Sequence, residues 1–82
     1  MPRLRNLSGR DLVRILGGFG FSVVAIRGSH AKLRRELPDG RRETLTVPLH
    51  DTLATGTVRA VYRQAARFIA ESDLRAHFYS ES

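Results

Sequence analysis

The residues best suited to chemistry in this sequence lie in one short stretch: Gly28-Ser29-His30, followed by Lys32 and Arg34. An imidazole can gain and lose a proton near neutral pH. A neighbouring ammonium or guanidinium group can neutralise phosphate oxygens. A histidine beside cations therefore suits acid–base chemistry on a phosphate group.

Two further histidines, His50 and His77, are less suggestive. His50 follows Pro48 and precedes Asp51 in a loop, where we expect a buried histidine bonded to its neighbours rather than a direct chemical role. His77 lies beside Phe78 near the C-terminus and is expected to be structural or solvated.

The sequence predicts no metal site and no cofactor. It contains no cysteine, which excludes disulfides, thiolate zinc sites and thiol catalysis. His30 and His50 have no third ligand at a suitable spacing, so a zinc site built on them is not expected.

Length and charge limit what the chain can be. The 82 residues carry 14 Lys+Arg against 8 Asp+Glu, a net charge of +6. One small domain over residues 1–82 is expected, and its active site should be shallow. The positive charge favours an RNA or DNA partner. With neither an apolar run of about 18 residues nor a signal-peptide core, we expect a cytoplasmic protein that does not bind membranes.

Helix signals occur on both sides of the central stretch. Ser8 and Asp11 predict a capped helix that ends at Gly17-Gly18, where a left-handed glycine is expected. Thr57 is expected to cap a second long helix, and a short closing helix is predicted over residues 72–79.

Strand signals occupy the middle of the chain. Strands are predicted over residues 21–27, 30–37 and 42–47, with a Pro-Asp-Gly turn at 38–40. The resulting α-β-β-β-α order predicts an α+β fold: a three-stranded antiparallel sheet with both helices on one face and a short C-terminal helix. The open face would present His30, Lys32, Arg34, Arg42, Thr44 and Thr46. Residues 27–42 hold six cations against two carboxylates, a local net charge of +4.

The second helix also carries a basic ridge, formed by Arg59, Arg63 and Arg67. Such a ridge is most often a solvated face. Arg59 lies in the first turn, where a cation opposes the helix dipole, so its position makes more sense if an anion docks there.

Several short motifs occur in a fixed order: Gly28-Ser29-His30, then Val47-Pro48-Leu49-His50, then Gly56-Thr57-Val58-Arg59. Together they strongly resemble the HicA toxins, small cytoplasmic mRNA interferases of bacterial toxin-antitoxin pairs. The resemblance runs from about residue 7 to residue 78. It implies a double-stranded-RNA-binding-domain-like fold, and it carries the family's catalytic histidine to His30.

The resemblance and the residues together suggest metal-independent cleavage of mRNA, in which the RNA 2′-hydroxyl attacks the adjacent phosphate. His30 would be the general base or acid. Lys32 and Arg34 would neutralise the phosphorane, and Ser29 would position the histidine or donate to a phosphate oxygen. Arg42 and Arg59 are predicted as further RNA contacts.

Regulation is expected to come from a HicB-like antitoxin that covers His30, because so short a chain has no segment from which to build a lid. Two alternatives remain open. One is a non-catalytic RNA-binding module that uses the same basic face. The other is a structural or partner-binding domain with an incidental charge.

Overall fold

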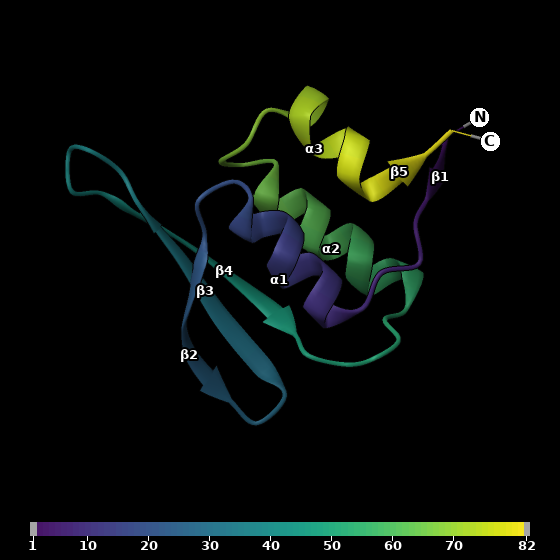
Figure 1. Cartoon of the computed structure of the whole chain (residues 1–82), viewed down its shortest axis with the longest axis horizontal. Coiled ribbons are helices and arrows are strands. Elements are labelled where there is room, and N and C mark those ends of the chain that lie inside the picture. Colours follow the sequence, from purple (N-terminus) through teal and green to yellow (C-terminus); the bar gives the residue numbers. More distant parts are fainter. Residues whose placement is uncertain (1, 82) are drawn as a thin grey trace.

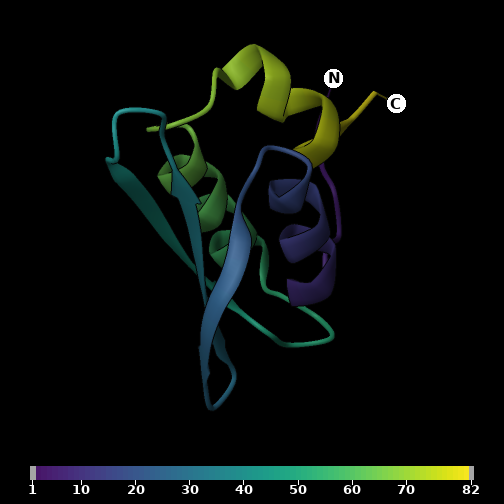
Figure 2. The same ribbon diagram turned by 60° about the vertical axis from the view of Figure 1, so that its left-hand side comes forward.

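The chain folds into an antiparallel sheet with helices on one face, and the other face of the sheet is open (Figures 1 and 2). This computed structural model describes residues 2–81. Within them, no helix has the length and apolar character needed to cross a membrane. The elements in chain order are β1 (Arg3–Leu4), α1 (Gly9–Gly17), β2 (Ser22–Arg27), β3 (His30–Glu36), β4 (Arg42–Pro48), α2 (Thr55–Ala65), α3 (Glu71–Phe78) and β5 (Tyr79–Ser80). The α+β prediction is confirmed, and the order is consistent with a double-stranded-RNA-binding-domain-like fold.

The main sheet of the described residues has the strand order β2-β3-β4, and both neighbouring pairs are antiparallel. Each strand matches its predicted range to within one residue at either end. Ala31 pairs with Val47 and Leu33 with Leu45, and these four side chains are at most 1 % exposed. They face the helices, so the alternate positions of β3 and β4 face the open side. Gly40, with φ of +88°, closes the predicted turn.

The start of α1 is fixed by its cap. The Asp11 backbone N–H donates to Ser8 Oγ at 3.1 Å, and the Ser8 N–H donates to the Asp11 carboxylate at 2.9 Å. This confirms the predicted capping box. The bonds from Ser8 favour the ionised carboxylate and hold the pKa of Asp11 below its ordinary value.

The end of α1 differs from the prediction. Gly18 has a right-handed φ of −64°, and the left-handed glycine is Gly20, with φ of +95°. The Phe21 N–H donates back to the Leu16 carbonyl at 3.1 Å, and the Gly20 N–H donates to Gly17 at 3.1 Å. This is the Schellman pattern, and it places the left-handed residue just before the apolar residue that returns to the core. The expectation of a left-handed glycine at Gly17-Gly18 is therefore wrong.

The start of α2 also differs. Its N-cap is Ala54, and the N–H groups of Thr57 and Val58 both donate to the Ala54 carbonyl, at 2.9 and 3.1 Å. Thr57 therefore lies inside the first turn, and the prediction that it caps the helix is wrong. Thr55 and Gly56 already have helical geometry, so the helix begins before the predicted cap.

The predicted closing helix is confirmed as α3, which packs against α2 through an aromatic cluster. The ring of Tyr62 meets Phe78 and Tyr79 edge-on, at centroid distances of 5.2 and 5.5 Å. Its hydroxyl donates to Glu71 at 3.0 Å, and burial raises the pKa of this phenol above the usual value. Leu74 and Phe78 are fully buried. The unpredicted β1–β5 pair brings the two ends of the described chain together beside α3 (Figure 1).

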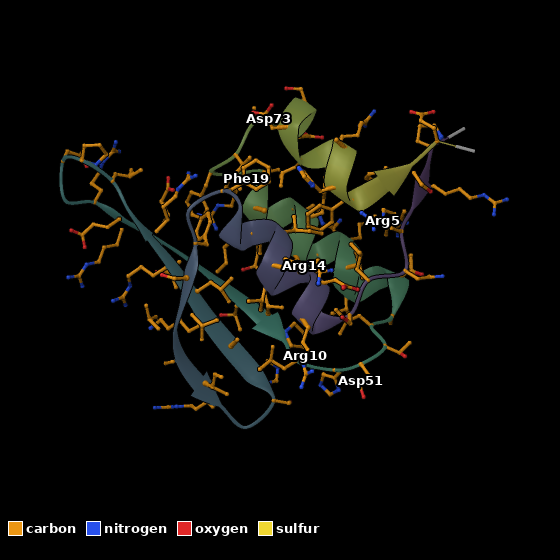
Figure 3. All side chains as sticks on the ribbon, in the orientation of Figure 1. Arg5, Arg10, Arg14, Phe19, Asp51 and Asp73 are labelled. Carbon is orange, nitrogen blue, oxygen red and sulfur yellow. The ribbon has the colours of Figure 1, made fainter. Side chains whose placement is uncertain are left out.

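The apolar strand β2 lies at an edge of the sheet, and its side chains stay exposed. Val23, Val24 and Ile26 are 40 %, 47 % and 59 % exposed, and the register slips at Val24. Val23 and Ile26 line a hollow of about 390 Å³ between β2 and α1. Arg10 and Asp51, neighbours in Figure 3, line the same hollow. An apolar edge strand of this kind offers a surface to which another chain can bind.

Candidate active site

His30 lies at the tip of the β2–β3 hairpin, at the first position of β3. The connection is only two residues, Gly28 and Ser29, and Gly28 has a φ of +57°, which glycine adopts without strain. A connection this short pairs Arg27 directly with His30 across the two strands. The imidazole is exposed to solvent, with a cation on the neighbouring strand.

The open face of the sheet is hollowed beside His30. This hollow, of about 400 Å³, is lined by Ala25, Arg27, His30, Lys32 and Thr46, and we call it the lysine hollow. The register explains its composition, because Lys32 pairs with Ala25 on one side and Thr46 on the other. His30 and Lys32 are two residues apart on one strand and therefore share a face. An imidazole and an ammonium group thus lie together on the open face.

Three residues that line the lysine hollow, Ala25, Arg27 and Thr46, were not among the predicted site residues. The signal for Arg27 was present, since the residue before a two-residue loop must pair with the residue after it. Thr46 was predicted on the open face, but its pairing with Lys32 depends on the β3–β4 register.

A second hollow lies on the other side of His30, between the hairpin tip and the start of α2. It measures about 360 Å³, and we call it the histidine hollow. Its lining residues are His30, Pro48, His50, Thr52, Leu53, Ala54 and Thr57. His50 is exposed there, so the expectation that it would be buried is wrong. The Leu49 N–H donates to the Ser29 carbonyl, and this bond joins the two segments while leaving the His50 imidazole free to face the hollow.

Arg34 lies further along β3, on the same face as Lys32. It pairs with Ser22 and Thr44, and its side chain is half-buried. Its Nε is buried and has no hydrogen-bond partner among the described residues. The guanidinium lies two residues beyond the lysine hollow and does not line it.

The remaining hairpin cations have different surroundings. Arg35 is held in an ion pair with Glu43 at 2.6 Å, and its Nη atoms donate to the carbonyls of Phe19 and Phe68 at 2.9 and 3.0 Å. It is therefore a structural residue rather than a free cation. Including Glu43, residues 27–43 carry six cations and three carboxylates, which reduces the expected local charge of +4 to +3.

Arg42 and Arg59 lie apart from His30. Arg42 pairs in register with Glu36. Glu36 is six residues from His30 along β3, or about 20 Å at the usual strand rise. Arg59 is exposed on α2 and lines neither hollow. It is two residues from Thr57, and residues at that spacing do not share a helix face. The amides expected beside an anion at Arg59, those of Thr57 and Val58, both donate to Ala54.

The remaining histidine, His77, is exposed on α3 and meets the Phe19 ring edge-on at 5.4 Å, as expected for a structural or solvated residue. Over residues 2–81, no group of three or more His, Asp and Glu side chains is placed to hold a metal ion.

All the residues of this site lie within a stretch of the chain that matches a known family. Residues 9–66 match the family described as "HicA toxin of bacterial toxin-antitoxin". The chain belongs to the HicA toxin family. The HicA match extends from the start of α1 to the end of α2 and includes every residue that lines the lysine and histidine hollows. Searches of curated proteins and of solved structures gave no match.

Proposed function

We propose that this HicA-family toxin is a metal-independent endoribonuclease that cleaves mRNA in the cytoplasm, with His30 as an acid–base group. The observation that carries the proposal is the exposed imidazole of His30 beside Lys32 in one open hollow. The net charge of +6 supports a polyanionic substrate. The shallow hollows on an open sheet face suit a flexible single strand.

The chemistry requires little from the protein. In RNA the 2′-hydroxyl can attack its own neighbouring phosphate, so the enzyme must move protons, hold the geometry and stabilise the crowded phosphorane. His30 would exchange a proton with a reacting oxygen. Lys32 and Arg27 would neutralise the phosphoryl oxygens. Ser29, which precedes His30 in the chain, would position the histidine or donate its hydroxyl or amide to one of these oxygens.

The proposal is tested by incubating the purified chain with RNA in excess chelator and analysing the new ends. We expect fragments with a 2′,3′-cyclic phosphate and a 5′-hydroxyl, and no cut where the attacking nucleotide is 2′-deoxy. Binding without any product would instead favour a non-catalytic RNA-binding module. Neither binding nor cleavage would favour a domain that only binds protein.

RNA affinity should depend on Lys32 and Arg34. We expect Lys32→Ala and Arg34→Ala each to weaken binding at low salt and to reduce the slope of log K against log salt by about 0.7 to 1 unit, as for one lost phosphate contact. Fluorescence anisotropy over a salt series measures both quantities. Arg14→Ala is the matched control, because it removes one exposed cation from α1 and should leave the slope unchanged.

A HicB-like antitoxin is the proposed partner, and we expect it to cover His30. The exposed apolar strand β2 lies at the edge of the sheet and leads into the hairpin tip, so a partner that wraps this edge can bury Ile26 on the helix side and cover Arg27 and His30 on the open side. An acidic partner should associate faster at low salt, while the buried apolar area should set the residence time. We therefore expect Arg34→Glu to lower the association rate severalfold, and Ile26→Ser to raise the dissociation rate.

Stopped-flow mixing with the cognate antitoxin measures the association rate, and a competition chase measures the dissociation rate. If neither substitution changes its rate, the partner binds elsewhere. The same conclusion follows if His30 in the complex still reacts with an imidazole reagent, as identified by peptide mass.

A further inference from the structure

His50 and His30 face the same hollow although they come from different elements. His30 begins β3, whereas His50 lies in the loop between β4 and α2. Both line the histidine hollow, and both side chains are exposed. The register pairs His30 with Pro48, so His50 follows two residues after the partner of His30.

The segment that carries His50 is held firmly from behind. The Gly9 N–H donates to the His50 carbonyl at 2.9 Å, and the Leu49 N–H donates to the Ser29 carbonyl. Gly9 is buried, and a Cβ built on it would overlap the Pro48 carbonyl and lie 2.7 Å from the Leu49 Cα. The backbone thus fixes the segment without any help from the His50 imidazole.

None of the other residues that line the histidine hollow has a side chain that ionises near neutral pH. Pro48, Leu53 and Ala54 are apolar, while Thr52 and Thr57 offer hydroxyls. The neighbouring Asp51 lines the hollow between β2 and α1, not this one. Among the lining residues, the two imidazoles are therefore the side chains suited to general acid–base chemistry.

In-line displacement at phosphorus places the attacking and leaving oxygens on opposite sides of the phosphate. Efficient cleavage therefore benefits from a base on one side and an acid on the other. A phosphate seated in the histidine hollow would lie between the two imidazoles, with His30 on one side and His50 on the other. Because His30 also borders the lysine hollow, that phosphate would still adjoin the cations beside His30.

We propose that His50 is the general acid of the cleavage reaction and that His30 is its general base; this inference rests on the proposed ribonuclease function. The neutral His30 takes the proton of the 2′-hydroxyl as the 2′-oxygen forms its bond to phosphorus. The bond from phosphorus to the 5′-oxygen breaks, and that oxygen keeps the electron pair and takes a proton from protonated His50. The products are a 2′,3′-cyclic phosphate and a 5′-hydroxyl, and exchange with water restores both histidines.

The test uses an RNA oligonucleotide in which sulfur replaces the bridging 5′-oxygen at one linkage, because a thiolate leaves without needing a proton. On ordinary RNA, His50→Ala should lower the cleavage rate by about 10²- to 10⁴-fold, the usual contribution of a proton-transfer group. On the sulfur-bridged linkage the same variant should cleave within about tenfold of the parent, whereas His30→Ala should stay impaired.

Asp51→Asn is the matched control for disturbance of the loop, and it should cut both substrates like the parent. Full activity of His50→Ala on ordinary RNA would overturn the assignment, as would a defect equally deep on both substrates. Rescue of His30→Ala by sulfur would overturn it as well. If the parent chain cuts neither substrate, the proposed ribonuclease function is wrong, and so are the roles assigned to His30 and His50.

Discussion

Replacing His30 with alanine is expected to abolish RNA cleavage and growth arrest while leaving the fold intact. Loss of a positioned proton-transfer group lowers rates by about 10²- to 10⁴-fold. The imidazole is exposed and lies outside the hydrophobic core, so the free energy of unfolding should change by no more than about 0.5 kcal/mol. A cleavage assay and a urea titration measure the two quantities on the same preparation.

His77→Ala is the matched control, since it removes an exposed histidine from α3 and lies outside both hollows. It should cut RNA at the parental rate. Should His30→Ala cut RNA as well as the parent, His30 is not an acid–base group. Should it unfold, the loss of activity would say nothing of chemistry, and the assignment of His30 as a free surface group would be wrong.

Replacing Arg35 with alanine is expected to cause a large loss of stability. Its guanidinium pairs with Glu43 on β4. It also donates to the carbonyls of Phe19 and Phe68, which follow α1 and α2. It also lies over the Phe21 ring, 4.8 Å from the centroid. Its side chain is 22 % exposed and that of Glu43 is 16 % exposed. Removing one partner from so enclosed a pair should cost about 3 kcal/mol, out of a total stability of about 5–15 kcal/mol.

Arg41→Ala provides the comparison for Arg35→Ala. Arg41 pairs with Asp39 at 2.7 Å, but the two side chains are 76 % and 55 % exposed. The substitution should therefore cost less than about 1 kcal/mol. Urea unfolding followed by circular dichroism compares the two variants directly. Equal losses in both would contradict the structural role given to Arg35.

The sequence was sufficient to predict features that depend only on residues close together in the chain. The capping box of Ser8 and Asp11, the turn closed by Gly40 and the alternation of β3 and β4 are all of this kind. The same local rules place His30 and Lys32 on one face. Errors arose where several residues could take the same role, as at Gly18 and Gly20 or at Ala54 and Thr57. The backbone hydrogen bonds at the ends of the helices show which residue takes the role.

Burial depended on neighbours that the sequence does not specify. The apolar residues of β2 predict a strand, but only the strand order shows that β2 lies at an edge and leaves Ile26 59 % exposed. The sequence does not show which cations of the hairpin are free and which are held by neighbouring groups. Of Arg34, Arg35 and Arg42, it is Arg35 that donates hydrogen bonds to carbonyls at the ends of α1 and α2, because its position in β3 faces the helices.

The sequence by itself determined the family, the order of the elements and the exposed position of His30 beside a cation. Only the tertiary structure decided where His50 lies. His30 and His50 are separated by the whole β3–β4 hairpin. They share a hollow because the register pairs His30 with Pro48 and because the backbone at Pro48 and Leu49 packs against Gly9 of α1. That contact joins residues about forty positions apart, and a close approach of two backbones over such a distance leaves no periodic pattern in the sequence.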